Sequence, residues 1–226
     1  MSARRRLVEL SHQISDGLVT YPGLPAPRID EYLSRAASRE HYAPGPEFSI
    51  GRITMVANTG TYLDTPFHRF ADGFDLAGLA LEQVADLEGV LVRVVGASGR
   101  AVGTDRLDGL DVGGRAVLIH TGWDRHWATE AYGSGHPFVT ADAAVWLADR
   151  GAALVGIDSL NIDDTADGSR PAHTTLLQAG IPIVEHLTGL DQLPVSGFRF
   201  SAAPARVAGM GTWPVRAYAT LPGDLV

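Results

Sequence analysis

Short apolar runs rich in β-branched residues recur along the whole chain, and most of them end in a glycine, a proline or a charged residue. Runs of this length predict β-strands, either half-buried where polar residues alternate or fully buried where they do not. The expected strands cover residues 7–14, 48–57, 90–95, 116–119, 154–157, 181–184, 206–210 and 215–219.

Other segments carry apolar residues at helical spacing. Thr140 is a good N-cap for a helix that Gly151 ends, and Gly180 ends another. The expected helices cover residues 79–86, 140–150 and 172–179. No repeat or linker divides the chain, so we predict one α/β domain over residues 1–226. The strands outnumber those of a simple βαβ alternation and no G-x-G-x-x-G motif opens a helix, which argues against a Rossmann fold.

Composition narrows the function classes. A net charge of −8 and a pI near 5.4 leave no basic stripe for nucleic acid. The chain has no cysteine, which removes thiolate metal sites and cysteine nucleophiles and fits a reducing cytosol. No apolar run approaches the roughly 20 residues of a membrane span. We therefore expect a cytoplasmic protein that acts on a small molecule and has no nucleic-acid or membrane partner.

The most informative segment is 58–68, which reads N-T-G-T-Y-L-D-T-P-F-H. It places an amide, a phenol, a carboxylate and an imidazole close together. Gly60 and Pro66 keep this segment from forming a regular helix. The apolar run 53–57 leads into it, so the polar groups are expected where a strand ends, which is where sites are commonly built.

Asp64, His68, His173 and Glu185 all fall at expected strand or loop ends. Carboxylate and imidazole together are ligands for Zn²⁺ or Mn²⁺. A simpler interpretation stands beside this one. The chain has eight histidines, most histidines do not bind metal, and Glu185 could be a surface residue at a strand end. From the residues alone both interpretations stay open.

Several short motifs occur in an order that is similar to one known family. Segment 58–68 resembles the signature H-x-G-T-H-x-D-x-P-x-H of the cyclase family, which contains bacterial kynurenine formamidase and isatin hydrolase. Further matches in the same order are Tyr21-Pro22-Gly23, His120-Thr121-Gly122-Trp123, Gly156-Ile157-Asp158, His173-Thr174-Thr175-Leu176-Leu177 and Ile183-Val184-Glu185-His186-Leu187. Six matches in one order are far more specific than any single match.

The resemblance implies a swivelling β/β/α fold with a mixed sheet that curls toward a barrel. It implies a homodimer or homotetramer in which the segment around Tyr21 helps to form a neighbour's pocket. It also implies that Asp64, His173 and Glu185 hold a divalent metal ion, and that His68 donates and accepts protons.

Two positions depart from the signature, because Asn58 and Tyr62 stand where the family has histidines. In the family those histidines hold one metal of a pair, and an amide or a neutral phenol is a poor replacement. Two hypotheses follow. The first is a hydrolase of a small, aromatic formamide or cyclic amide with one Zn or Mn ion. The alternative is a metal-free relative: a cyclase, a lactone or dehydration enzyme, or a small-molecule binder.

The remaining polar and aromatic residues receive weaker interpretations. Asp158, Asp163 and Asp164 are interpreted as a solvated acidic loop, with Asp158 as a candidate support for the site. His126 and His136, in the long loop 125–139, are candidate lid residues. The predicted substrate contacts are Tyr21, Asn58, Tyr62 and Trp123.

Overall fold

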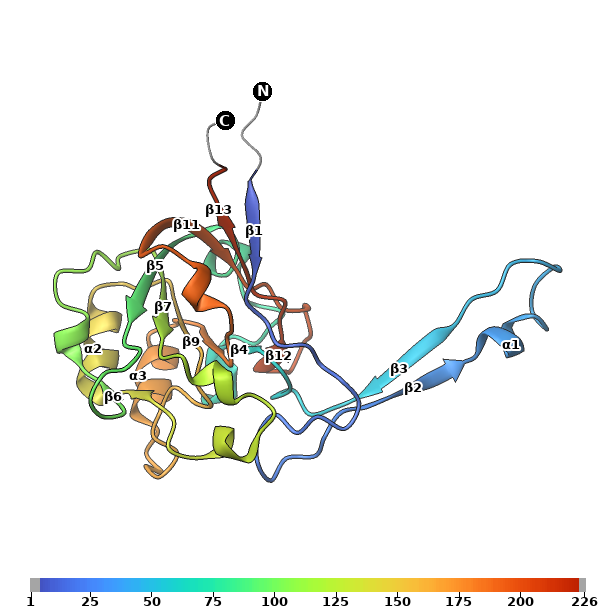
Figure 1. Cartoon of the computed structure of the whole chain (residues 1–226), viewed down its shortest axis with the longest axis horizontal. Helices are drawn as coiled ribbons and strands as arrows, with labels where there is room; N and C mark the ends of the chain where they lie inside the picture. Colours follow the sequence, from blue (N-terminus) through green and yellow to red (C-terminus); the bar gives the residue numbers. More distant parts are fainter. Residues whose placement is uncertain (1–4, 224–226) are drawn as a thin grey trace.

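A mixed sheet of nine strands forms the centre of the computed structural model, which describes residues 5–223. The four central strands β5, β7, β9 and β10 run parallel, and the outer pairs are antiparallel. The sheet curls into a half-barrel, which confirms the predicted fold class (Figure 1). In spatial order the strands are β1 (Arg6–Glu9), β13 (Tyr218–Leu221), β11 (Ser196–Ser201), β5 (Leu87–Arg93), β7 (Ala116–His120), β9 (Leu154–Ile157), β10 (Ile183–Glu185), β4 (Tyr62–Asp64) and β12 (Thr212–Pro214).

Two helices, α2 (Ala141–Asp149) and α3 (Pro171–Gln178), pack side by side on one face of the sheet (Figure 1). The N-cap of α2 is Thr140, as predicted, because its hydroxyl accepts a hydrogen bond from the N–H of Ala143. These helices cover one of two apolar clusters, and the second cluster lies against the opposite face.

Strand β7 shows how both faces are covered. All its residues are buried; Val117 and Ile119 belong to the cluster beneath the helices, whereas Ala116 and Leu118 belong to the other. Because successive side chains of a strand point to opposite faces, a strand covered on both sides must be apolar throughout. This explains the continuous apolar runs of the central strands.

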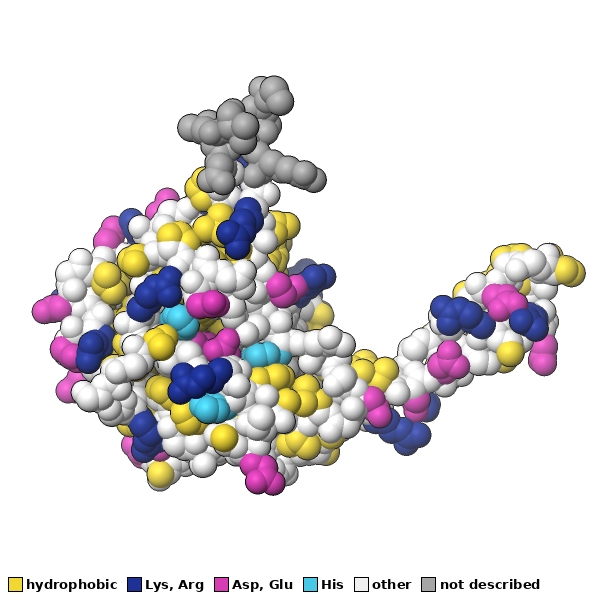
Figure 2. Space-filling model, viewed as in Figure 1, with side chains coloured by type: hydrophobic (Ala, Val, Ile, Leu, Met, Phe, Trp, Pro, Cys, Tyr) yellow, Lys and Arg dark blue, Asp and Glu magenta, His cyan; other side chains and the backbone are white. Residues whose placement is uncertain are grey.

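A separate two-stranded ribbon projects from the body, and we call it the arm, residues 28–54. It consists of β2 (Arg28–Leu33), the short helix α1 (Arg35–Ser38) and β3 (Ile50–Thr54) (Figure 1). Ile29 and Ile53 lie opposite each other and are 43% and 47% exposed. Figure 2 shows hydrophobic side chains among charged ones on this arm.

Several predicted elements differ in the structure. Segment 79–86 forms only a 3₁₀ turn at Leu81–Gln83, because Asp86 takes a left-handed conformation at φ 54° and β5 begins at once. Segment 206–210 contains no strand; β12 lies just beyond it. Strands β2, β4 and β11 were not expected. The smaller elements are β6 (Ala101–Val102), β8 (Phe138–Val139) and the 3₁₀ turns Pro66–His68, Thr104–Arg106, Trp123–His126, Glu130–Gly133 and Leu190–Gln192.

None of the helices within residues 5–223 is long and apolar enough to cross a membrane.

Candidate active site

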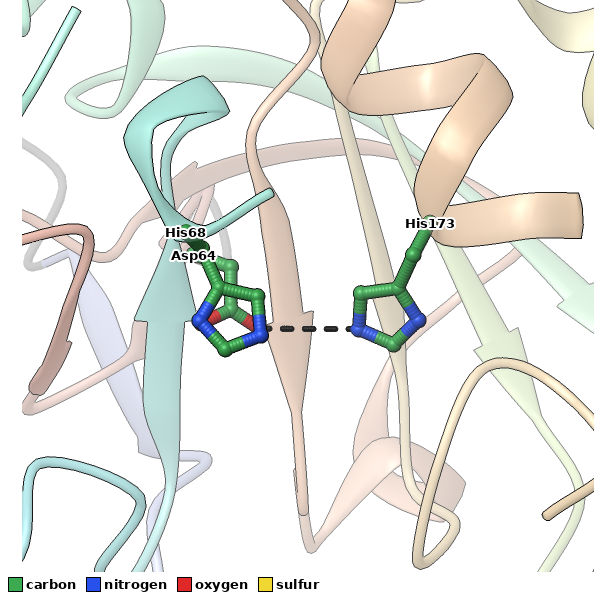
Figure 3. A group of neighbouring side chains, drawn as sticks. All are labelled: Asp64, His68 and His173. Atoms are coloured by element: carbon green, nitrogen blue, oxygen red, sulfur yellow. Dashed lines mark ion pairs between the residues drawn. The ribbon is translucent and has the colours of Figure 1, made fainter. Parts of the chain in front are cut away.

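Three elements bring the predicted metal ligands together. Strands β4 and β10 pair so that Tyr62 lies directly opposite Glu185. Asp64 is two residues further along β4, so the side chains of Tyr62, Asp64 and Glu185 share one face of the sheet. His173 reaches that face from α3, and Figure 3 shows its ring facing Asp64 and His68.

His173 lies close enough to each of the two carboxylates to share a divalent ion with it. Nε2 of His173 lies 3.7 Å from Oδ2 of Asp64 and 3.6 Å from Oε1 of Glu185. A tetrahedral ion with bonds of about 2.1 Å holds its ligand atoms about 3.4 Å apart. Oδ2 of Asp64 is buried and has no hydrogen-bond partner among the described residues. A buried carboxylate oxygen of this kind is costly unless a cation or donor meets it, so the residues present fit a metal ion.

Asp163 orients His173. Nδ1 of His173 donates a hydrogen bond of 2.7 Å to Oδ2 of Asp163, which leaves the lone pair on Nε2 for a metal. The backbone N–H groups of Ala172 and His173 also donate to this carboxylate, at 2.6 and 3.1 Å. Asp163 is fully buried, so its interpretation as part of a solvated loop was wrong.

Asp158 is also fully buried, because its carboxylate accepts hydrogen bonds from the backbone N–H groups of Thr121 and Gly122. It therefore fixes the loop after β7. Of the three aspartates, only Asp164 keeps partial exposure, with a side chain 23% exposed and paired with Arg100.

The electrostatics of the cluster favour a cation. Burial disfavours the charged form of His173, but the surrounding carboxylates outweigh burial and raise its pKa to about 10. Glu185 makes the largest of these contributions. Burial also raises the pKa of Glu185 to about 7, although His173 opposes this. Burial alone would raise the pKa of Asp64, but the nearby imidazoles of His68 and His173 hold it below its usual value.

A buried chain of hydrogen bonds runs away from Glu185. Its Oε2 accepts a hydrogen bond of 2.7 Å from the hydroxyl of Tyr62. The oxygen of Tyr62 lies 3.2 Å from Nε2 of His186, and Nδ1 of His186 lies 2.8 Å from the hydroxyl of Tyr132. Burial lowers the pKa of His186 to about 3, so its ring is neutral. Because Tyr62 donates to Glu185, His186 must donate from Nε2 and accept from Tyr132 at Nδ1.

Neither His186 nor Tyr132 was identified as a site residue from the sequence. The available signal for His186 was its position directly after Glu185. Oε1 of Glu185 accepts a further hydrogen bond of 2.6 Å from the N–H of Ile162. Both carboxylate oxygens are thus held in place, one of them by the phenol of Tyr62 that replaces a signature histidine.

His68 is held by residues from the end of the chain. The hydroxyl of Thr212 donates to Oδ1 of Asp64 and lies 2.8 Å from Nδ1 of His68. The hydroxyl can donate only once, so neutral His68 must carry its proton on Nδ1 and leave Nε2 free to accept one. Gly211 packs against this turn, since a Cβ there would lie 2.2 Å from the backbone nitrogen of His68.

His68 is also a candidate ligand. One ligand atom from each of Asp64, His68 and His173 lies within 4.8 Å of the others. Glu185 is not within this limit of both Asp64 and His173, although its Oε1 lies 3.6 Å from Nε2 of His173. The side chain of His68 is 35% exposed and lies at the open side of the site. Glu185 as the third ligand stays a prediction.

A cavity of about 460 Å³ opens over these groups. Trp123 lies outside it and lines a neighbouring hollow, with its indole N–H donating to the carbonyl of Tyr132. His136 is fully buried, so it is no lid residue. A larger hollow of about 530 Å³ beside β5 and β11 contains no histidine. The site cavity is lined by Tyr21, Pro22, Gly23, Leu24, Asn58, Tyr62, His68, Arg69, Asn161, Arg170, His173 and Glu185.

Proteins of known function and solved structures resemble this chain over almost its full length. Kynurenine formamidase from Bacillus cereus (strain ATCC 14579) is 27% identical over 212 residues, which cover 93% of this chain and 95% of that protein. The kynurenine formamidase of Geobacillus thermodenitrificans is 29% identical over 217 residues, with the same coverage.

The fold is shared with isatin hydrolase A from Ralstonia solanacearum, with a TM-score of 0.82, 23% identity, and coverage of 96% of this chain and 92% of that one. A predicted metal-dependent hydrolase from Bacillus stearothermophilus has a TM-score of 0.76 and 26% identity, and covers 96% and 99%. The model of the family described as "Putative cyclase" matches residues 8–164, which is well over half of the chain. The protein therefore belongs to the Cyclase family.

Proposed function

We propose that this protein hydrolyses a small aromatic amide, either a formamide or a cyclic amide, with one divalent zinc or manganese ion. The observation that carries the proposal is the buried Oδ2 of Asp64, which has no hydrogen-bond partner in the part of the chain that the structure describes and lies 3.7 Å from Nε2 of His173. Asp64, His173 and Glu185 would hold the ion. A bound ion there would lower the pKa of water and polarise the amide carbonyl.

His68 supplies the proton chemistry. Its free Nε2 can accept a proton from the attacking water, and the hydrogen bond from Nδ1 to Thr212 keeps the ring oriented. The protonated ring then returns the proton to the departing amine nitrogen. Tyr21 lines the cavity and offers an aromatic surface to a planar substrate.

The comparisons support this reaction class without naming the substrate. The two curated relatives described above are kynurenine formamidases, and solved neighbours with the same fold include isatin hydrolases. The first name denotes hydrolysis of a formamide, and the second denotes hydrolysis of isatin. At 27% identity the substrate can differ while the chemistry is kept.

A metal-free or non-hydrolytic relative is the second candidate. The observation that favours it is the hydrogen bond from Tyr62 to Glu185, which ties up an oxygen that would otherwise be free for a cation. Oε1, which lies nearest to His173, still has a lone pair beyond its bond to Ile162. One ligand position on Glu185 therefore remains, which is why we place the hydrolase first.

The test is hydrolysis of formanilide and of isatin by protein stripped with EDTA and then reloaded with Zn²⁺ or Mn²⁺. We expect no turnover by the stripped protein and recovery with one of the two ions. If protein that holds one ion per chain, by elemental analysis, hydrolyses neither compound nor other aryl formamides, the hydrolase proposal is wrong.

We also propose that the arm packs against a second copy of the chain. An isolated two-stranded ribbon is marginally stable in water, and Ile29 and Ile53 are too exposed to stabilise it alone. Multi-angle light scattering of Ile29→Ser with Ile53→Ser should show a smaller assembly than the parent. The pair Asp30→Asn with Arg52→Gln, which alters the ion pair within the arm, is the control and should keep the parent mass. The cytoplasmic location stays a prediction.

A further inference from the structure

Two arginines, Arg69 and Arg170, line the same cavity as His173 and Glu185. They come from separate parts of the chain. Arg69 directly follows the candidate base His68, and Arg170 is the N-cap residue of α3, which carries His173. The cavity is therefore bordered by acidic and imidazole groups at its metal site and by two guanidinium groups elsewhere.

Neither guanidinium forms an ion pair with a carboxylate within residues 5–223, although hydrogen bonds from Ser169, and to a smaller extent the charge of Arg170, lower the pKa of Asp167. Arg69 donates from Nε to the hydroxyl of Thr174 at 3.1 Å and from Nη2 to the carbonyl of Ser169 at 2.8 Å. Arg170 donates from Nη1 to the carbonyl of Asp164 at 3.2 Å. All of these acceptors are uncharged. Several arginines elsewhere form ion pairs, although Arg93 and Arg206 bond carbonyl groups instead. The ion pairs are Arg39 with Glu47, Arg100 with Asp164, Arg199 with Asp86 and Arg216 with Glu9.

Both side chains keep donors for a ligand. A guanidinium carries more N–H groups than these contacts use, in a planar fork that matches the two oxygens of a carboxylate. The protein as a whole has a net charge of −8. Cations that no described carboxylate pairs with, in a cavity of an acidic protein, point to an anionic partner that comes from outside the chain.

The backbone at Arg170 gives independent support. This residue has φ 49° and ψ 61°, in the left-handed region, and it is followed by Pro171. A side chain beyond Cα is disfavoured in that conformation, and glycine would adopt it at lower cost. Non-glycine residues in such conformations cluster at functional sites. An arginine here costs stability that glycine would avoid, which fits a role for its side chain.

We infer that Arg69 and Arg170 bind a carboxylate group of the substrate, so that the preferred substrates are aromatic amides that also carry a carboxylate. This inference rests on the proposed amide hydrolysis and adds the class of substrate. The arginines set specificity, while the amide bond is broken at the metal site.

The first experiment compares two formamides that differ only by a carboxylate, 2-formamidobenzoate and formanilide. The measured quantity is the ratio of their kcat/KM values for the metal-loaded protein. The parent should favour 2-formamidobenzoate, and Arg69→Gln and Arg170→Gly should each reduce the ratio by roughly tenfold or more, mainly through KM. Arg206→Gln is the matched control, because Arg206 also bonds only a carbonyl but lies outside the cavity, and it should keep the parent ratio.

A carboxylate can also bind a metal ion, so the second experiment uses metal-free protein. Calorimetry should detect binding of 2-aminobenzoate and weaker or no binding of aniline, and both arginine variants should lose the difference. Arg170→Gly should also unfold at the same or a higher temperature than the parent, since it relieves the left-handed backbone. If the role of Arg170 were purely structural, Arg170→Gly would instead unfold at a lower temperature than the parent.

The outcomes separate the two proposals. If the protein hydrolyses no formamide but 2-aminobenzoate binding still depends on both arginines, the hydrolase proposal fails and the carboxylate site stands. If formanilide and 2-formamidobenzoate are hydrolysed equally well, or the variants keep the parent ratio and binding, the arginines do not recognise a carboxylate.

Discussion

Replacing Tyr62 with phenylalanine tests the buried chain that leads to Glu185. The ring stays, so no cavity forms, but two hydrogen bonds are lost. Oε2 of Glu185 loses its donor, and a hydrogen bond to a charged group contributes about 1.5–3 kcal/mol. Nε2 of His186 loses its acceptor, and the buried N–H left unsatisfied costs about 1–3 kcal/mol. The metal-free variant should therefore be less stable by roughly 3–5 kcal/mol. For a domain of this size that is a drop in Tm of roughly 10 °C.

The assay is urea and thermal unfolding of the metal-free protein, followed by circular dichroism. Tyr132→Phe removes only the donor to Nδ1 of His186 and should cost less than Tyr62→Phe. Tyr218→Phe changes a side chain that is 39% exposed and should stay within about 0.5 kcal/mol of the parent. Two results would contradict this account of the buried hydrogen bonds. In the first, Tyr62→Phe is as stable as Tyr218→Phe. In the second, Tyr132→Phe lowers the free energy of unfolding more than Tyr62→Phe does.

Four further predictions concern the metal site. His68→Ala should lower turnover by roughly a hundredfold or more but keep most of the metal. His173→Ala and Glu185→Ala should lose the metal. If His68→Ala loses as much metal as they do, His68 is a ligand. Elemental analysis of the parent should find at most one tightly held ion per chain, and two ions would contradict the loss of a subsite. Asn58→His combined with Tyr62→His should take up more metal than the parent, and unchanged uptake in a folded variant would show that these positions do not face an ion. The last concerns pH, because protons compete with metal for His173, whose pKa is raised to about 10. The stability that its proton contributes to the metal-free protein is complete below about pH 6.5 and is lost as the pH rises through about 10. The increase in Tm caused by added Zn²⁺ should therefore be larger at pH 8.5 than at pH 6.5, and an equal or smaller increase would contradict this.

Local sequence signals predicted two of the three elements that carry the proposed ligands, but β4, which carries Asp64, was not expected as a strand. The apolar run before Glu185 and the helix that Gly180 ends are both visible in the sequence, and β10 and α3 lie where these signals place them. The hydrogen-bonded surroundings were not predicted. That Tyr62 lies opposite Glu185 depends on the pairing of β4 with β10, which joins positions 123 residues apart and leaves no local pattern.

Burial of an acidic residue is similarly invisible in the sequence. Asp163 occurs among other aspartates and reads as a polar loop, yet the N–H groups at the start of α3 satisfy its carboxylate inside the protein. Strand β2 of the arm was missed for another reason, whereas the run 48–57 did predict β3. Strand β2 is short and largely exposed, so it lacks the apolar alternation by which a strand that packs on a core is recognised.

The contacts of Gly211 and Thr212 have a consequence for the order in which the protein becomes functional. Asp64 and His68 emerge early in synthesis, but the hydroxyl that orients both belongs to a residue 148 positions after Asp64. Contacts this distant in sequence form late in folding, because a long loop must close first. The nascent chain therefore cannot present a finished site until β12 has joined the sheet. Metal loading should follow folding of the whole chain, and fragments that end before residue 211 should neither orient His68 nor retain an ion.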